Sequence, residues 1–320
     1  MCTTIGFLNK KGIVFGRTLE IGMKLPQNPL YVPPDISFDK DLDGKDIVSK
    51  YSIIGSSFFN IVSFGDGMNS AGLVGSANYY PKYASFASEK SKDKRNIHTK
   101  NVLSIFLATC KNIEEVRILA KDLLVLSEDG NGEKSNEMHY FFMDQTGKGI
   151  VLEPNNGILE VKENDIGVMT NAPNFEFHKL NLSNYVSLTN KNYDENKFTN
   201  YTALKFGEGS GMLGIPGDFT PTSRFVRAAY FVSKTKKDLD VEESVLQAFR
   251  ILSQFDIPDF SVGEENFDKT VYTAVFDYVN NKYYVKYHNN PNIQIVDINS
   301  LMNEKKIIFL DMKYNFFEGN

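Results

Sequence analysis

The chain starts with MCTTIGFLNKKGIVFGRT, residues 1–18, and this stretch predicts how the fold begins. Residues 3–8 and 13–18 are rich in β-branched and aromatic side chains, and a short polar segment ending in glycine separates them. Two such runs around a short turn predict a β-hairpin. The ends of a chain are usually poorly ordered unless a strand or helix holds them in place. We therefore expect this hairpin to hold Cys2 in a rigid position.

The order of elements along the rest of the chain indicates the fold class. Helices are predicted at residues 98–110, 112–126, 220–230 and 240–255. Strands are predicted at residues 53–64, 73–80, 139–144, 149–153, 157–162, 166–170, 271–278, 283–288, 293–297 and 307–312. A turn is predicted at residues 65–69, and irregular segments at residues 181–200 and 207–217.

Tight turns join most neighbouring strands, which favours antiparallel pairing. The helices come in pairs rather than one per strand, which argues against a doubly wound parallel sheet. This order predicts an α+β fold in which two antiparallel sheets pack together with helices outside. No linker and no internal repeat is visible, so we expect one domain over residues 2–320.

Composition and charge narrow the class of partner. The chain has 320 residues, a formal net charge of −5 and a pI of about 5.5, without the clustered basic segments typical of nucleic-acid binders. No run approaches the ~18 apolar residues that a membrane helix needs, and no signal-peptide pattern is visible at the N-terminus. We expect no nucleic-acid partner, no membrane partner and a cytoplasmic location, or a periplasmic or secreted one if a signal peptide was removed. The four histidines lack metal-ligand spacing, so no metal and no cofactor are expected.

Cys2 and Cys110 are the only cysteines, and they differ in setting. Cys110 ends an apolar helical run, which predicts a buried core residue. Removal of Met1 would leave Cys2 with a free thiol and a free α-amino group. An α-amino group has an ordinary pKa of about 7.7–8.0, so it can accept the proton of its own residue's thiol. The alternative is that Cys2 is merely a small residue that permits removal of Met1.

Arg17 and two asparagines have more than one interpretation. Arg17 is either a surface residue or a buried one, and a buried arginine needs a carboxylate partner. Glu20 is a candidate partner, although residues three apart in a strand point to opposite faces. Asn171 precedes Ala-Pro and Asn78 ends a predicted strand, so each could serve only as a turn or strand-end residue.

Five segments together resemble the choloylglycine hydrolase family, the bile salt hydrolases and penicillin V acylases among the N-terminal-nucleophile hydrolases. They occur in family order and cover nearly the whole chain, and the last one is long and specific. The segments are residues 1–3 (MCT), 15–18 (FGRT), 66–73 (DGMNSAGL), 166–173 (IGVMTNAP) and 207–225 (GEGSGMLGIPGDFTPTSRF).

The resemblance implies an αββα four-layer sandwich and hydrolysis of a linear amide by Cys2 after removal of Met1. It places Arg17 beside the thiolate and Arg224 in support of the site. Asn171 would hold the α-amino group or the oxyanion, and Asn78 would line the oxyanion hole. The family's bile salt hydrolases usually have aspartate where this chain has Glu20. The resemblance also suggests a homo-oligomer, a tetramer.

The substrate prediction rests on two residues near the end of the strand predicted at residues 73–80. Asn78 followed by Tyr79 resembles the bile salt hydrolases, whereas penicillin V acylases tend to place tyrosine at the asparagine position. We expect a glycine- or taurine-conjugated bile salt, bound in an apolar pocket. The predicted pocket residues are Met23, Phe58, Phe59, Phe64 and Tyr79. Penicillin V and N-acyl-homoserine lactones are the alternative substrates, and a non-catalytic acyl-binding protein is the alternative of another class.

Overall fold

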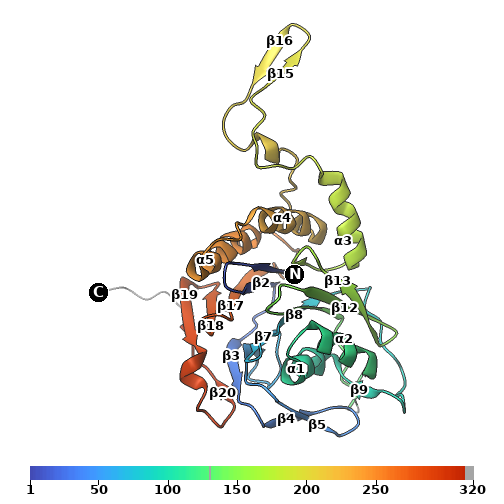
Figure 1. Ribbon diagram of the computed structural model, residues 1–320. Helices are drawn as coiled ribbons and strands as arrows, with labels where there is room; N and C mark the ends of the chain where they lie inside the picture. The colour runs from blue at the N-terminus through green and yellow to red at the C-terminus, as the bar shows by residue number, and fades with distance from the viewer. Residues whose placement is uncertain (130, 314–320) are drawn as a thin grey trace.

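A six-stranded antiparallel sheet forms one of two inner layers of the molecule (Figure 1). The computed structural model describes residues 1–129 and 131–313. The strand order is β14 (Val168–Met169), β1 (Cys2–Leu8), β2 (Ile13–Ile21), β17 (Lys269–Asp277), β18 (Lys282–Tyr287) and β19 (Asn290–Asp297). The predicted N-terminal hairpin is therefore present as β1 and β2. Strand β1 lies inside the sheet: it pairs with β2 from Cys2 onward, and with β14 at Thr4 and Ile5.

An eight-stranded antiparallel sheet forms the second inner layer. Its order is β13 (Ile158–Glu163), β12 (Gly149–Asn155), β11 (Met138–Met143), β8 (Val74–Tyr79), β7 (Asp66–Asn69), β6 (Ile53–Phe58), β3 (Gln27–Val32) and β20 (Ile308–Phe309). Two small sheets lie outside it. The strands β9 (Arg95–Ile97) and β10 (Leu123–Val125) pair in parallel, and β4 (Ser37–Lys40) pairs with β5 (Asp46–Val48).

Helices cover the outer face of each sheet (Figure 1). Helices α1 (Thr99–Thr109) and α2 (Ile113–Asp122) contact strands of the eight-stranded sheet. Helices α4 (Pro221–Lys234) and α5 (Val241–Leu252) contact strands of the six-stranded sheet, and the short α3 (Phe175–Asn181) packs on α4. The four-layer αββα fold is therefore confirmed.

Local sequence signals explain where the helices begin. Pro221 occupies the first turn of α4, where its missing N–H costs no helical hydrogen bond. Asp240 and Glu243 form a capping box at the start of α5. Helix α3 was not predicted from the sequence. Asn174 caps it, because its side-chain oxygen accepts a hydrogen bond from the N–H of Phe177. These caps satisfy backbone donors that a helix leaves free.

Two apolar cores hold the layers together. One lies between the sheets and under α4 and α5, where the rings of Phe15 and Phe141 pack with centroids 5.2 Å apart. The other lies between the eight-stranded sheet and α1, where Phe106 and Phe142 meet at 5.1 Å. Cys110 belongs to this second core, as predicted from its apolar run. The prediction of one domain over residues 2–320 stays a prediction, and its end lies outside the described residues.

Strand β7 occupies the segment predicted to be a turn. Its glycines serve close packing rather than chain reversal: a Cβ on Gly67 would meet the Leu107 side chain at 2.8 Å. A Cβ on Gly55, the partner of Gly67 in β6, would meet the Asp66 carbonyl at 2.0 Å. As part of a strand rather than a turn, Asp66 has its side chain in the interior of the molecule.

The arm, residues 186–217, projects from the body of the molecule (Figure 1). It contains the hairpin of β15 (Glu195–Phe198) and β16 (Tyr201–Leu204), in a region partly predicted to be irregular. Large apolar side chains of the arm are exposed, among them Phe198 at 59%, Tyr201 at 69% and Phe206 at 111%. No helix in the described part of the chain is long and apolar enough to cross a bilayer.

Candidate active site

Cys2 lies at the first position of β1, and its side chain is 2% exposed. Its strand partner in β2 is Leu19. The backbone N–H of Cys2 donates a hydrogen bond of 2.9 Å to Oδ1 of Asn171. Strand pairing and this hydrogen bond fix the main chain at Cys2, as the sequence predicted from the hairpin.

Arg17 reaches the cysteine from β2. Its Nη2 lies 2.9 Å from Sγ of Cys2, and its Nη1 donates to the carbonyls of Gly65 and Ala77 at 3.1 and 3.3 Å. The residue is 1% exposed, so the surface interpretation of Arg17 is excluded. Burial alone lowers the pKa of its guanidinium, but the acidic groups around it raise the pKa above its ordinary value. Arg17 therefore presents a full positive charge to the sulfur.

Asp66, rather than Glu20, is the carboxylate that lies next to Arg17. The distance from Nη1 of Arg17 to Oδ2 of Asp66 is 3.6 Å, and both side chains are buried. Because Asp66 comes from the other sheet, no spacing along the chain could have revealed this pair. The expectation of a carboxylate for a buried arginine was correct, and the candidate partner was wrong.

Asn171 and Arg224 hold the main chain of the cysteine from the other side. Oδ1 of Asn171 accepts from the Cys2 N–H and from Nη2 of Arg224 at 2.7 Å, while its Nδ2 donates to the Tyr79 carbonyl at 2.7 Å. Nη1 of Arg224 donates to the Cys2 carbonyl at 2.5 Å and to the Thr3 hydroxyl at 2.8 Å. These contacts determine which end of the Asn171 amide faces the cysteine nitrogen.

Glu20 is buried beside these groups, at 1% exposure. Burial raises the pKa of its carboxyl, while the N-terminal ammonium and Arg224 act in the opposite direction. Neither carboxylate oxygen has a hydrogen-bond partner of standard geometry, although the Thr18 hydroxyl is close enough to favour the charged form. The structure thus brings Glu20 to the predicted site, and its part in any reaction stays a prediction.

Asn78 does not point toward the cysteine. Its Nδ2 donates to the Thr170 carbonyl at 2.9 Å, and its Oδ1 accepts from the Thr4 hydroxyl at 3.2 Å. Successive side chains of a strand point to opposite faces, so the next residue, Tyr79, faces the pocket instead. The geometry gives no support to Asn78 as an oxyanion donor. The side chain holds the peptide that precedes Asn171.

A pocket of about 560 Å³ opens at Cys2. Its wall contains four of the five predicted pocket residues, Phe58, Phe59, Phe64 and Tyr79. The fifth, Met23, lines a neighbouring cavity that shares Leu25 with this pocket. Further apolar residues of the wall, which come from several strands and from α1, were not predicted from the sequence: Leu19, Leu25, Ala77, Leu103, Met138 and Tyr140.

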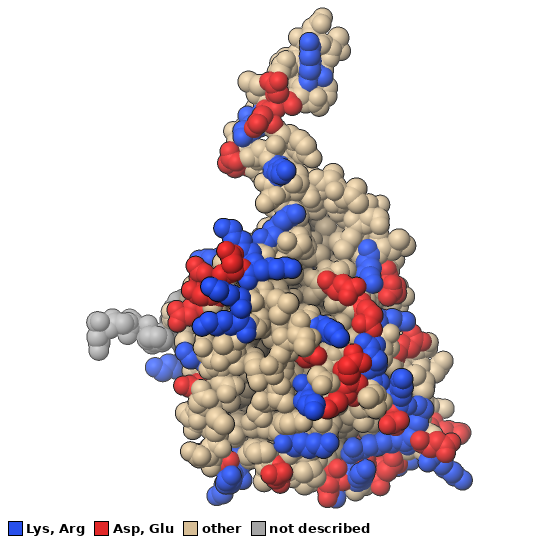
Figure 2. Space-filling view, viewed as in Figure 1, with Lys and Arg blue, Asp and Glu red and all other residues tan. Residues whose placement is uncertain are grey.

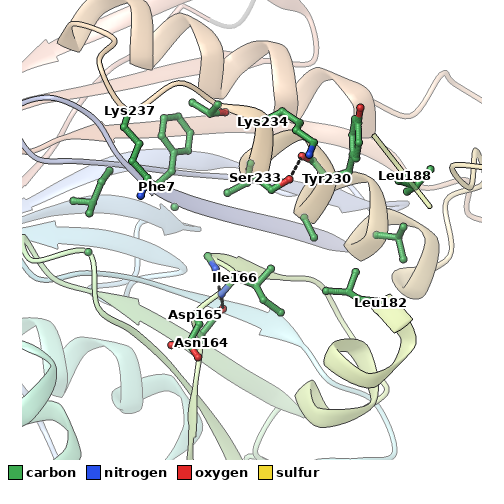
Figure 3. A pocket seen from close by; sticks show the side chains of 18 of the residues that line it. Phe7, Asn164, Asp165, Ile166, Leu182, Leu188, Tyr230, Ser233, Lys234 and Lys237 are labelled. Carbon is green, nitrogen blue, oxygen red and sulfur yellow. Dashed lines mark hydrogen bonds between the residues drawn. The ribbon is translucent and has the colours of Figure 1, made fainter. Parts of the chain in front are cut away.

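A second cavity, of about 600 Å³, lies between α4 and the loop that precedes β14 (Figure 3). Phe7, Ile166, Leu182 and Tyr230 line it, and Lys234 and Lys237 lie at its rim (Figure 3). The lining contains no cysteine, histidine or arginine. Size alone therefore does not mark the reactive site, and the smaller pocket at Cys2 is the candidate.

Within residues 1–129 and 131–313, no group of three or more His, Cys, Asp and Glu side chains could hold a metal ion. The reactive groups of the candidate site are the thiol of Cys2, the buried guanidinium groups of Arg17 and Arg224, and the buried carboxyls of Glu20 and Asp66. An αββα sandwich with a cysteine at the start of an inner strand has the fold and layout of the N-terminal-nucleophile hydrolases.

The chain belongs to the choloylglycine hydrolase family, described as linear amide C–N hydrolases, because the family model matches residues 2–309. It is 32% identical over 305 residues to a bile salt hydrolase/transferase of Clostridium perfringens, with 93% of each chain covered. It is 27% identical over 299 residues to a bile salt hydrolase/transferase of Bifidobacterium longum, covering 92% of this chain and 94% of that one. The chain is therefore a hydrolase that acts on linear amide bonds.

Solved structures agree with this assignment. A mutant of the conjugated bile acid hydrolase from Clostridium perfringens superposes with a TM-score of 0.91 at 29% identity, covering 100% of this chain and 99% of that chain. A penicillin V acylase from Agrobacterium tumefaciens superposes with a TM-score of 0.77 at 20% identity, covering 95% of this chain and 88% of that chain. The second likeness shows the fold alone.

Proposed function

We propose that this protein hydrolyses glycine- or taurine-conjugated bile salts, with Cys2 as the nucleophile after removal of Met1. The observation that carries the proposal is the 2.9 Å contact between Nη2 of Arg17 and Sγ of Cys2. The backbone N–H of the same cysteine donates a hydrogen bond to Asn171. A cation in contact with the sulfur favours the thiolate, which is the nucleophilic form.

The first half of the reaction uses only groups of Cys2 and the substrate. With Met1 removed, the nitrogen that donates to Asn171 becomes a free α-amino group. In its neutral form this amine takes the thiol proton, and the sulfur attacks the amide carbonyl carbon. The C–N bond breaks as the amine returns the proton to the leaving nitrogen. The acyl group is left on sulfur as a thioester.

Water completes the reaction. The α-amino group takes a proton from water as the oxygen attacks the thioester carbonyl, and it gives this proton to the sulfur as the carbon–sulfur bond breaks. The free acid leaves and the thiol is restored, so atoms and charges balance over the cycle. Asn171 has one N–H of its Nδ2 occupied by the Tyr79 carbonyl, which leaves the second for the oxyanion. One such donor is commonly worth about 3–4 kcal/mol in the transition state.

The pocket at Cys2 suits a large apolar acyl group. Phe58, Phe64 and Tyr140 contribute aromatic surface, and burial of apolar area stabilises a bound group by roughly 25 cal/mol per Å². Several relatives carry the name bile salt hydrolase, which supports a sterol as the acyl group. Penicillin V and N-acyl-homoserine lactones are the alternative substrates, because their acyl groups also suit an apolar pocket.

A side-by-side release assay tests the substrate and the nucleophile together. Taurocholate, glycocholate, penicillin V and a long-chain N-acyl-homoserine lactone are compared, with Cys2→Ala as the control. We expect fast release from the bile salts and none from the folded variant. Turnover by Cys2→Ala, or by protein whose peptide map shows Met1 in place, would refute the mechanism. Release from penicillin V or the lactone alone would refute the substrate but keep the nucleophile.

The same assay decides the alternative of another class. A non-catalytic acyl-binding protein would release no amine from any of these four amides, yet would bind the bile salts. Binding can be followed by the fluorescence of the tyrosines in the pocket wall, since the chain contains no tryptophan.

We further propose that the protein works as an assembly of its own copies, a tetramer by family resemblance. The arm supports this proposal because it exposes large apolar side chains that its own chain leaves uncovered, such as Tyr201 at 69% and Leu204 at 68%. Contiguous exposed apolar side chains are typical of surfaces that bind another protein. A second copy of this chain is the partner that we propose.

A further inference from the structure

Asp66 connects the cysteine's arginine to a buried tyrosine. Its Oδ2 accepts a hydrogen bond of 2.5 Å from the hydroxyl of Tyr272 and lies 3.6 Å from Nη1 of Arg17. Its Oδ1 accepts from the Ser56 hydroxyl at 2.7 Å. All four side chains are buried, so water does not screen the charges. One carboxylate oxygen therefore divides its negative charge between a neutral donor and a cation.

Arg17 lies between this carboxylate and the sulfur. Nη2 faces Sγ of Cys2, while Nη1 faces Asp66 and two backbone carbonyls. The guanidinium carbon also lies 5.7 Å from the centre of the Tyr272 ring. Any change in the pull that Asp66 exerts on Arg17 must change the positive charge felt at the sulfur, because the same cation contacts both.

Tyr283 extends the chain of contacts by one step. Its hydroxyl lies 3.1 Å from the Ser56 hydroxyl. Since Ser56 has one proton and donates it to Asp66, Tyr283 is the donor in this contact. Tyr283 thus acts on Asp66 only through Ser56, whereas Tyr272 contacts Asp66 directly. The two tyrosines form a matched pair that differs in distance from the carboxylate.

We propose that Asp66 and Tyr272 are positioning residues for the reaction of Cys2: Asp66 holds Arg17 and offsets part of its charge, and Tyr272 limits that offset through its hydrogen bond to Asp66. The inference rests on the proposed function, in which the thiolate of Cys2 is the nucleophile. Neither residue lines the pocket at Cys2, so both act through Arg17.

The two residues have opposite effects on the thiolate. Without the Asp66 charge, Arg17 faces the sulfur uncompensated, and the thiolate becomes more stable. Without the Tyr272 hydroxyl, the charge of Asp66 acts more strongly on Arg17, and the thiolate becomes less stable. A purely structural role would not produce shifts of opposite sign.

Other charged groups near the sulfur stay constant in these comparisons. They are Glu20 on the same strand as Arg17, Arg224 and Arg227 on α4, and Asp268 in the wall of the pocket at Cys2. Among the ionic contacts of the described residues, Asp66 pairs only with Arg17. The variants therefore change the Asp66–Arg17 contact and leave the other groups in place.

The experiment measures the rate of alkylation of Cys2 by iodoacetamide against pH, in full-length protein lacking Met1, together with amide turnover. The label is read on the Cys2 peptide, since Cys110 is also buried and free. Asp66→Asn should move the midpoint of the profile to lower pH and Tyr272→Phe to higher pH. We expect about a threefold change in thiolate fraction, roughly half a pH unit, for each. Tyr283→Phe, the matched control, should leave the midpoint unchanged.

Three outcomes overturn the inference. These are shifts of Asp66→Asn and Tyr272→Phe in the same direction, no shift in either, and an equal shift in Tyr283→Phe. If Asp66→Asn does not fold, a comparison of Tyr272→Phe with Tyr283→Phe still tests the inference. Only Tyr272→Phe should raise the midpoint of the alkylation profile. Alkylation reports on the thiol without a substrate. If the two variants shift in opposite directions but Cys2→Ala keeps its amide turnover, the proposed function is refuted, and only the effect of Asp66 and Tyr272 on the thiol stands.

Discussion

The region around Cys2 and the arm are built in opposite ways. Around Cys2, strands of both sheets and helix α4 meet, and the polar side chains there are almost completely buried. In the arm, β15 and β16 pair with each other, and most of the side chains are exposed. Figure 2 shows that the tip of the arm carries few charges, while acidic and basic side chains mix over the viewed face of the body.

The difference indicates which interactions stabilise each region. Buried hydrogen bonds and ion pairs near Cys2 depend on one another, so loss of one partner leaves the rest unsatisfied. An isolated two-stranded ribbon is marginal in water, so in the proposed assembly the arm would gain its stability from the second copy. Changes near Cys2 should therefore act within one chain, and changes in the arm should act between chains.

The largest effect is expected for Arg224→Ala. The substitution removes the donors to the Cys2 carbonyl, to Thr3 and to Asn171, and takes away one of the cations near the buried Glu20 carboxyl. We expect the free energy of unfolding to fall by about 3–5 kcal/mol, because buried acceptors lose a charged partner. Amide turnover by the folded fraction should fall at least about 100-fold.

Lys205→Ala in the arm is the control for Arg224→Ala. Lys205 pairs with Asp194 and Glu208 at 2.9 and 3.4 Å, but both acidic partners are exposed. Urea unfolding and turnover should match those of the unchanged protein. Similar losses in the two variants would contradict the contrast between the regions.

A smaller, pH-dependent effect on the free energy of unfolding is expected from His178. Its Nε2–H donates to the Asn171 carbonyl at 2.9 Å, and burial lowers its pKa from 6.5 to about 4. Between these values the unfolded chain binds a proton that the folded chain does not, so the free energy of unfolding rises with pH. The gain from this residue is on the order of 3 kcal/mol.

His178→Gln tests this sign. Glutamine can donate to the same carbonyl but cannot titrate, so the slope of unfolding free energy against pH should be shallower in the variant. Glu20, whose raised pKa gives a slope of opposite sign, is present in both proteins and cancels in the difference. Parallel slopes from urea unfolding across this pH range would show that His178 is already protonated in the fold.

The smallest effect on turnover is expected in the arm. Phe198 and Tyr201 face each other at the end of the hairpin, and both are more than half exposed. Phe198→Ser combined with Tyr201→Ser should shift the mass measured by light scattering toward smaller species and leave kcat per chain unchanged. Lys197→Ser on the same hairpin should change neither. An unchanged mass in the double variant would refute the arm as the contact between copies.

Local signals in the sequence were sufficient for the layout of the fold. The hairpin of β1 and β2, the capping box of α5 and the proline at the start of α4 are all set by neighbouring residues. The arm hairpin was missed because its strands are only four residues long and have no buried face. Strand β7 was missed because glycines that permit close packing look the same in sequence as glycines that permit a turn.

The contacts of the site needed more than local signals. Resemblance to a family selected Arg17, Asn171 and Arg224, and the structure brings all three to Cys2. Asp66 lies within a segment quoted for that resemblance, yet its pairing with Arg17 joins two sheets and cannot be derived from spacing. The direction of Asn78 depends on the register of β8 against β11, and a shift of one residue reverses every side chain.

Met1 extends the ladder of β1 by one residue, and its loss has a consequence beyond freeing an amine. The Glu20 N–H donates to the Met1 carbonyl at 2.8 Å, and the Glu20 carbonyl accepts from the Met1 nitrogen. When Met1 is cut away, both groups lose their partners at the wall of the pocket. A buried main-chain donor and acceptor left unpaired cost free energy. The proposed removal of Met1 would therefore leave one open backbone pairing position in the sheet beside the new amine, suited to water or to the amide of an incoming substrate.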